Sequence, residues 1–465
     1  GRELFTRLAP RLLDAAQATG APDAAFNRFA AFFSGLSAGV QVQSLFLAQP
    51  ALFELLVEVL AVAPRLAATL ARRPAAFDAL LDPGFFAPPE AETIEAAVTA
   101  AARGVAGFED AMNAVRRAYR EQAFRIGLQV LSGSATADEA GRAYAGLADG
   151  CVRSLAPAAL AETARLGGAF AGGEAAVVAL GKLGSREMTA RSDLDLMTLY
   201  AAEPGAVSEG KGWMGETWYG RFTQRLIAAL SAPTAEGGLY EIDMQLRPSG
   251  AKGPVAVSLP AFEHYYAAEA DTWEFLALTR ARVVWATSDA FAERCRAAIE
   301  AALSRPRDRE TVARDVRDMR ALMERERPPS GFWDLKLSPG GQVDVEFVAQ
   351  YLQITGAPLR PSTVEALQAA RDAGALDARR AERLIAAWTL AQDLQQILRA
   401  ALDDDAPPEN EPEPFRKRLT RAGGARGARG DLEPLARKLA RVRTHARKAF
   451  ETILQPATET RRRRV

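Results

Sequence analysis

The chain has 465 residues, of which 48% are hydrophobic and 25% are charged, as in ordinary globular proteins of several domains. Lysine plus arginine and aspartate plus glutamate both total 58, so the charge balance gives no sign of a nucleic-acid partner. Two cysteines are too few for a disulfide framework and suit a reducing cytoplasm, and two histidines make a histidine-based zinc site unlikely. No apolar run is long enough to span a membrane. Because the chain begins at Gly1 directly in helix-like sequence, we expect it to be part of a longer protein.

The first part of the chain, rich in Ala, Leu and Phe, is predicted to be helical. Four residues at helical spacing define an apolar stripe that we expect to face a core: Phe26, Phe29, Ala30 and Phe33. Breaks at Pro83-Gly84 and Pro88-Pro89 predict a boundary, after which long helices continue to about residue 166. Four arginines of one such helix are expected to form a solvated face: Arg116, Arg117, Arg120 and Arg125.

The centre of the chain carries a short apolar run at 177–180, a glycine-rich turn, and a second strand-like run at 193–200. Side chains alternate along a strand, so Asp193 and Asp195 share one face while the leucines between them point into a core. Two carboxylates on a buried strand are costly unless positive charge offsets them, and a pair of divalent cations that also binds a polyphosphate would do so. The alternative is two surface acids at a solvated strand end, which the leucines disfavour.

The spacing of Gly184-Ser185 and Asp193-x-Asp195 resembles the signature of the polymerase-beta-type nucleotidyltransferase superfamily. This resemblance implies a third acid on a later strand, for which Asp243 is the candidate. It lies in the run 239–246, where alternation with period two places Glu241 and Asp243 on the open face of a half-buried strand.

Basic residues follow the third acid. Arg247 and Lys252 lie in a turn-rich loop and are either phosphate ligands or incidental loop charges. The helix-like run at 273–282 contains Arg280 and Arg282, for which phosphate binding and an ion-pair network are equally good interpretations.

Helical sequence resumes near residue 305 and is interrupted once. Gly340-Gly341 permits an unusual backbone before a helix that begins near Val343. Asp344 and Glu346 would lie in the first turn of that helix, where the helix dipole alone is enough to explain acidic residues. Farther on, the Asp- and Pro-rich segment 403–413 is expected to be a loose connection.

These patterns predict an α+β fold in which a small mixed sheet, the polymerase-beta-like core, is flanked by all-α domains. We divide the chain into a helical linker or regulatory region at 1–105, a helical lead-in at 106–166, a catalytic nucleotidyltransferase domain at 167–304, a C-terminal helical bundle at 305–455 and a basic tail at 456–465.

The whole chain resembles the bacterial glutamine synthetase adenylyltransferases, bifunctional enzymes with an AMP-attaching half and an adenylyl-removing half joined by a helical region. The strongest points of likeness are Gly181–Leu196, Leu239–Gly250, Trp273–Val284 and Lys336–Leu352. The sequences of two segments, Leu239–Asp243 and Val343–Phe347, resemble those of the C-terminal, AMP-attaching half. One departure is Gln245, where arginine is usual in the family.

The resemblance implies transfer of AMP from ATP to a tyrosine of glutamine synthetase, with PII signal protein and glutamine as effectors. Three carboxylates suit two Mg²⁺ ions, one held by Asp195 and Asp243 and one by Asp193 and Asp195. Backbone N–H groups of the Gly184-Ser185 turn are expected to approach the phosphates. The side chains expected to bind the triphosphate are Arg247, Lys252 and Lys336.

Three alternatives remain open at this point. The first is that the chain is the phosphorolytic, adenylyl-removing half of the same enzyme. The second is that it is a regulatory module that binds nucleotide without catalysis. An RNA nucleotidyltransferase shares the core, but the neutral charge and the lack of a basic stripe make it less favoured.

Overall fold

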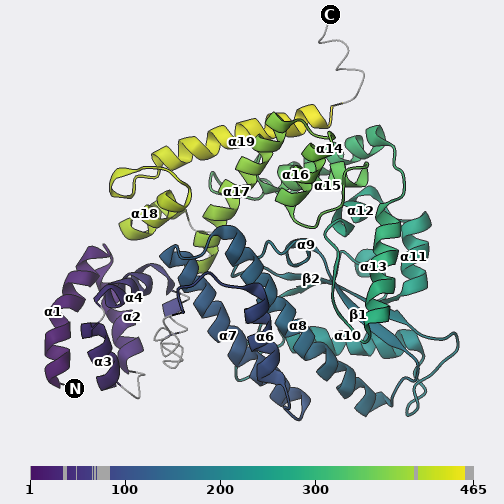
Figure 1. Ribbon diagram of the computed structural model, residues 1–465, viewed down its shortest axis with the longest axis horizontal. Helices are drawn as coiled ribbons and strands as arrows, with labels where there is room; N and C mark the ends of the chain where they lie inside the picture. Colours follow the sequence, from purple (N-terminus) through teal and green to yellow (C-terminus); the bar gives the residue numbers. More distant parts are fainter. Residues whose placement is uncertain are drawn as a thin grey trace, which may run out of the picture.

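A computed structural model describes residues 2–34, 39–48, 50–64, 66–67, 70, 84–402 and 407–455 (Figure 1). Pro83, the first part of the segment 403–413 and the basic tail 456–465 lie outside the described residues. The predicted plan is confirmed in outline, because helices precede residue 167 and follow residue 305, and a small mixed sheet lies between them. No helix in the described ranges has the length and apolarity that crossing a membrane requires.

Four helices open the chain: α1 (Arg2–Ala18), α2 (Pro22–Ser34), α3 (Gly39–Ala48) and α4 (Pro50–Val62). Phe29 of α2 packs with its ring edge against Phe53 of α4, at a centroid distance of 5.7 Å, and lies 6.2 Å from Phe46 of α3. The predicted helix is therefore confirmed, but its predicted stripe is wrong by part of a turn. Phe26 is 44% exposed and Ala30 is exposed, whereas the buried face is formed by Ala25, Phe29 and Phe32.

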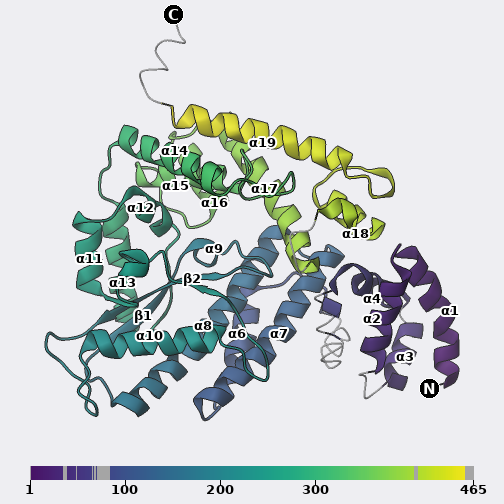
Figure 2. The ribbon, with the colours of Figure 1, turned by 180° about the vertical axis from the view of Figure 1, so that it is seen from behind.

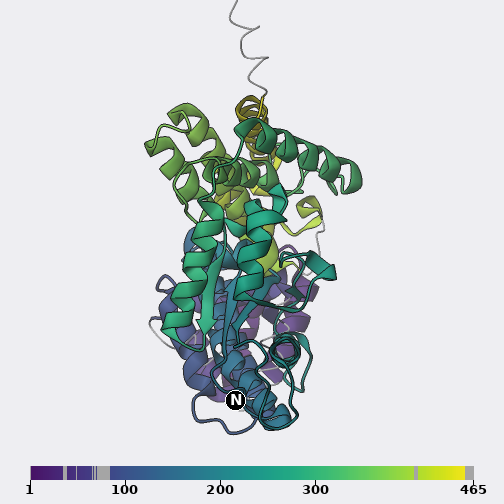
Figure 3. The ribbon, with the colours of Figure 1, turned by 90° about the vertical axis from the view of Figure 1, so that its right-hand side faces the viewer.

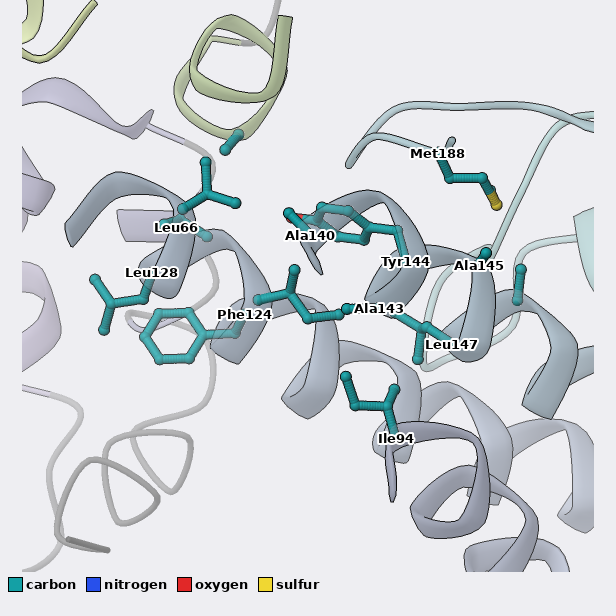
Figure 4. Packing of buried hydrophobic residues seen from close by; sticks show 14 of the residues in the cluster. Leu66, Ile94, Phe124, Leu128, Ala140, Ala143, Tyr144, Ala145, Leu147 and Met188 are labelled. Atoms are coloured by element: carbon teal, nitrogen blue, oxygen red, sulfur yellow. The ribbon is translucent and has the colours of Figure 1, made fainter. Parts of the chain in front are cut away.

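The next three helices, α6 (Ala91–Ala102), α7 (Phe108–Ser132) and α8 (Ala137–Gly167), pack closely together and continue into one core with the sheet. Figure 4 shows buried side chains of one hydrophobic cluster on all three helices, among them Ile94, Phe124, Tyr144 and Leu147. Gly146 allows the approach of α6 to α8, since a Cβ there would lie 2.4 Å from the carbonyl oxygen of Ala91.

Arg116 on α7 contradicts the predicted solvated face. It is fully buried and donates hydrogen bonds to the carbonyl oxygens of Gly237, Ala229 and Ala232, at 2.6, 2.9 and 2.6 Å. These carbonyls lie at the end of a later helix, α10 (Gly215–Ser231), and in the chain that follows it, so the guanidinium fastens α7 to the segment that leads to Asp243. Arg117, its neighbour, is solvated as predicted, with its side chain 53% exposed.

The sheet has the order β3-β2-β1-β5, with β4 paired to the later part of β2. Its strands are β1 (Glu174–Ala179), β2 (Leu194–Ala201), β3 (Ile242–Asp243), β4 (Ala256–Ser258) and β5 (Arg282–Ala286). β1 is antiparallel to β2 and β5, and β2 is parallel to β3 and β4. The predicted strand 239–246 is thus wrong in length, because only two of its residues pair. The predicted helix-like run 273–282 also ends early, and Arg282 begins β5.

Helices cover both faces of this sheet. On one face Val177 and Leu196 pack in the same core as Phe222 of α10 and residues of α8. On the other face Val178 and Met197 share a core with α11 (Leu259–Ala268), α12 (Thr272–Leu278) and α13 (Asp289–Leu303). Figures 1 and 2 show α10 and α8 running beside the sheet, and the short helix α9 (Gly181–Gly184) above β2.

The C-terminal helices close the molecule above the sheet, as the side view in Figure 3 shows. They are α14 (Arg309–Glu326), α15 (Gln342–Ile354), α16 (Thr363–Asp372), α17 (Ala378–Ala401), α18 (Glu413–Ala422) and α19 (Glu433–Ile453), with short 3₁₀ turns at Pro408–Asn410 and Ala428–Gly430. The predicted helix start near Val343 is confirmed, and Gly340 before it has the positive φ of 76° that glycine permits.

Candidate active site

The three predicted carboxylates lie at the start of β2 and on β3. Asp193 is exposed and directly precedes β2, while Asp195 on β2 and Asp243 on β3 are half-buried. The parallel register places Asp195 opposite Asp243, and the N–H of Leu194 donates to the carbonyl oxygen of Glu241 at 2.9 Å. Directly opposite residues on neighbouring strands project from the same face, so the pairing brings two acids together although they are far apart in the sequence.

The electrostatics of Asp195 agree with this placement. Burial first, then the neighbouring charges of Asp193 and Asp243, raise the pKa of its carboxyl group to about 7, although Lys336 and Arg280 act in the opposite direction. Repulsion among the three acids thus adds to the effect of burial on this pKa. Burial and repulsion both disfavour the ionised form of Asp195. A cation that bound here would offset the free-energy cost of both, because it favours the ionised form.

The three acids do not form a complete metal-ligand cluster in the part of the chain that the structure describes. In the described ranges, no three His, Cys, Asp or Glu side chains are gathered as a group that could hold one ion, so the expected close convergence of the three acids is not seen. Like charges repel without a cation, and Asp243 uses its Oδ1 to accept the N–H of Gln245 at 2.7 Å. The donor set nevertheless fits Mg²⁺ chemically, since carboxylate oxygens are its preferred protein ligands.

Gly181 forms a cradle for Asp195. Its φ is 51°, and a Cβ at this position would lie only 1.9 Å from Oδ2 of Asp195. The N–H of Leu180 also donates to the carbonyl oxygen of Asp195 at 2.9 Å. In the turn between β1 and β2, the carboxylate of Asp195 thus packs directly against the backbone of Gly181. A side chain at position 181 would displace this carboxylate.

The predicted role of Gly184 and Ser185 as phosphate contacts is not supported by their hydrogen bonds. Their N–H groups donate to the carbonyl oxygens of Leu180 and Gly181, at 2.8 and 3.2 Å, inside α9 and its cap. Gly184 is needed for packing instead, because a Cβ there would lie 1.9 Å from the carbonyl oxygen of Arg280.

Arg247 is also engaged within the protein. It is 8% exposed and donates to the carbonyl oxygens of Met244, Gly253 and Pro254, at 2.6, 3.1 and 2.9 Å. These bonds shape the loop after Asp243, and a role of Arg247 in binding the triphosphate stays a prediction. Lys252 is exposed on the same loop.

Lys336 borders a cavity of about 590 Å³, together with Trp333, Gln395, Arg399 and Asn410. It is exposed, and its positive charge acts to lower the pKa of Asp195. Lys182 of α9 approaches the same region, because its Nζ donates to Oε1 of Gln395 at 2.9 Å. Burial lowers the pKa of Lys182 to about 8, with Lys336 and Arg399 adding to the effect and Glu346 opposing it.

Arg280 and Arg282 belong to ion-pair networks, which decides between the two interpretations left open above. Arg280, with its side chain 8% exposed, lies 3.1 Å from Oε1 of Glu346 and donates to Oγ1 of Thr363 at 2.8 Å. Arg282 forms two hydrogen bonds to the buried Asp149, at 2.8 and 2.9 Å. Both arginines thus join the sheet region to helices outside it.

Asp344 is not a simple helix-dipole residue. It is fully buried, accepts the N–H of Gly340 at 2.7 Å and pairs with Arg447 at 3.2 Å and with Arg320. It ties the start of α15 to α14 and α19. Glu346, two residues farther along α15, pairs with Arg280 instead.

Comparisons with known proteins identify the family of the chain. A family model described as glutamate-ammonia ligase adenylyltransferase matches residues 53–321, more than half of the chain. The chain belongs to this adenylyltransferase family. A second model, described as GlnD PII-uridylyltransferase, matches residues 316–454, which cover the C-terminal helices.

Individual relatives of the adenylyltransferase family carry the name bifunctional glutamine synthetase adenylyltransferase/adenylyl-removing enzyme. One from Caulobacter vibrioides is 60% identical over 98% of this chain and 46% of its own length. One from Rhizobium meliloti is 40% identical over 98% of this chain and 47% of its own length, and one from Mesorhizobium japonicum is 43% identical over 88% and 42%. The chain therefore spans about half the length of these relatives.

In this member of the adenylyltransferase family, sequence reasoning missed Lys182, Glu187 and Asp149. Glu187 is buried and accepts the N–H and Oγ1–H of Thr363, at 2.8 and 3.0 Å. Lys182 and Glu187 lie on either side of the Gly184-Ser185 motif, and this closeness to the motif was the available signal. Asp149 had no comparable local signal, because its partner Arg282 is 133 residues away.

Proposed function

We propose that this chain transfers AMP from ATP to a tyrosine hydroxyl of glutamine synthetase and releases pyrophosphate. The observation that carries the proposal is the opposition of Asp195 and Asp243 on parallel strands, with Asp193 one residue before β2. Membership of the adenylyltransferase family and the names of the relatives support glutamine synthetase as the acceptor of AMP.

In this reaction the phenolic oxygen forms a bond to the α-phosphorus, and the bond from that phosphorus to the bridging oxygen breaks. Pyrophosphate leaves with the electron pair, and the phenol loses its proton. Asp193, Asp195 and Asp243 would hold two Mg²⁺ ions, which neutralise charge on the phosphates and favour the ionised acceptor. Gly181 keeps Asp195 in place, and Lys336 and Lys252 are our candidates for binding the triphosphate in a polymerase-beta-like core.

The adenylyl-removing reaction is the second candidate, because the names of the relatives contain both activities and the chain matches less than half of each. We favour attachment because Leu239–Asp243 and Val343–Phe347 resemble the attaching half. We also infer regulation by PII protein, which the PII-related description of the second family model supports. A role of glutamine as effector and a cytoplasmic location follow from the resemblance to the family and from the low cysteine content.

The experiment that tests the proposal is incubation of the chain with ATP, Mg²⁺ and purified glutamine synthetase, followed by peptide mass spectrometry. We expect a tyrosine peptide that has gained one AMP, and no such peptide when Mg²⁺ is removed by chelation. Unmodified glutamine synthetase after prolonged incubation with wild-type chain would contradict the proposal.

A further inference from the structure

A second cavity, of about 340 Å³, opens between the sheet region and the C-terminal helices. Its walls come from the loop after β3 and from α12, α14 and α15, and they include Leu246, Trp273, Met319, Leu322 and Phe347. In Figures 1 and 2 these helices lie together above the sheet, beside α9. The cavity is at the small end of the range of about 300 to 1,000 Å³ that is typical of ligand pockets, so it suits one ring system better than a whole nucleotide.

The cavity adjoins the acidic site through one residue. Gly181 lines it, and the same glycine lies against Oδ2 of Asp195. The next residue, Lys182, points to Gln395, which lines the larger cavity that contains Lys336. The short helix α9 therefore lies between the two cavities, and the smaller one reaches Asp195 through Gly181.

The charges in the two cavities differ. Arg280 and Glu346 border the smaller one, but they are paired with each other at 3.1 Å, and Arg280 also binds Thr363. A phosphate would have to break these bonds, whereas an uncharged aromatic ring would not. The larger cavity, with Lys336 and Arg399 in its wall, is the better match for a triphosphate.

The rim of the smaller cavity is apolar and open to solvent. Trp273 on α12 is 37% exposed, and Leu322 on α14 is 47% exposed. Large exposed apolar side chains beside a pocket are typical of a surface that another protein covers. We propose that this cavity receives the aromatic ring of the acceptor tyrosine while Trp273 and Leu322 contact the flanking polypeptide, an inference that rests on the proposed transfer to tyrosine.

The test compares two substitutions of the same kind. Leu322→Arg places a charge at the rim, and Leu13→Arg, at a leucine 53% exposed on α1, is the matched control. Binding of N-acetyl-tyrosinamide to each protein is followed by saturation-transfer NMR, and binding of a non-hydrolysable ATP analogue by calorimetry. Circular dichroism verifies that both variants fold.

We expect wild-type and Leu13→Arg protein to bind the tyrosine amide at concentrations of about 10 mM or below, and Leu322→Arg to lose at least about tenfold in affinity. The affinity for the ATP analogue should be unchanged in both variants. With glutamine synthetase as acceptor, Leu322→Arg should raise KM for that protein by a similar factor and leave kcat at saturating acceptor nearly unchanged.

Two results would overturn the inference. One is weaker binding of the ATP analogue by Leu322→Arg with unchanged binding of the tyrosine amide, which would assign the cavity to adenine. The other is no detectable binding of the amide to wild-type protein. Failure of the proposed function would look different, because glutamine synthetase would then stay unmodified while the binding of the two small probes is still measured.

Discussion

Gly181 and Asp195 are in direct contact, and the space for a Cβ on the glycine is filled by the carboxylate of the aspartate. Gly181→Ala should therefore displace that carboxylate. Since a shift of about 1 Å at a catalytic group costs about 100-fold, we expect kcat for AMP transfer to fall by about that factor.

The control for this change is Gly212→Ala. Gly212 also has a positive φ, of 63°, but nothing lies within 4 Å of its missing Cβ. Both alanine variants carry a backbone cost of about 1 kcal/mol, which thermal unfolding measures. Equal activity of the two variants would show that the contact with Asp195 has no role in transfer.

Asp195→Asn should reduce AMP transfer by about a thousandfold or more, because the carboxylate has both metal-binding and charge-balancing roles. Asp393→Asn on α17 is the matched control, since burial also raises the pKa of Asp393, to about 6, but its charged neighbour is Lys438. Pyrophosphate release measures both. Wild-type turnover by Asp195→Asn would refute the site assignment.

The same substitution should alter the pH dependence of stability in metal-free protein. The pKa of Asp195 is about 7 in the folded chain and near 4 when unfolded, so the folded chain binds more protons between those values. Its stability therefore falls as pH rises from about 4 to 7. Asparagine removes this loss, so we expect Tm of Asp195→Asn to exceed wild type by on the order of 1 to 3 °C at pH 8 and to match it near pH 4. A constant difference at every pH would contradict this explanation.

Arg280→Met should destabilise the chain by about 3 to 5 kcal/mol, because Glu187 and Glu346 would remain buried without their cation. Arg294→Met is the control, since Arg294 pairs with Glu174 at a surface position where its side chain is 55% exposed. That loss should be below about 1 kcal/mol. Urea unfolding measures both, and similar losses would show that the Arg280 network contributes little.

Arg116→Met tests the buried arginine of α7. Three carbonyl groups near the end of α10 would lose their charged donor, and we expect a loss of about 2 to 3 kcal/mol. Arg117→Met, one residue away and more than half exposed, should stay within about 0.5 kcal/mol of wild type. Urea unfolding should therefore give a lower midpoint for Arg116→Met than for Arg117→Met. Equal midpoints would contradict this prediction.

Local patterns in the sequence were enough to predict β2 and the start of α15. Alternation of acids and leucines identified the strand that carries Asp195, and the glycine pair marked the turn before the helix. Alternation around Asp243 had the correct face but the wrong length, since only Ile242 and Asp243 find a partner on β2. Strand length depends on which neighbour is available, and one strand's sequence does not contain that information.

Roles of the arginines could not be predicted for a related reason. Arg116 and Arg280 each have a buried guanidinium whose main partners lie far away in the sequence, and Arg247 has one whose partners are carbonyl groups of its own loop. For Arg116 those distant partners are carbonyl groups 113 to 121 residues away. Because every residue has a backbone carbonyl group, the sequence does not identify which ones accept these bonds. A solvated or phosphate-binding arginine looks the same as a structural one until the fold is known.

The central claim, that this chain attaches AMP, is tested most directly by two reactions run side by side. Attachment and removal pass through similar charge at the α-phosphorus, so the direction depends on whether the site orients ATP or inorganic phosphate beside the tyrosine. With ATP, Mg²⁺ and unmodified glutamine synthetase, we predict one pyrophosphate released for each AMP gained. With AMP-modified glutamine synthetase and phosphate but no pyrophosphate, we predict no ADP. Formation of ADP in the second reaction and no change in the first would contradict the account.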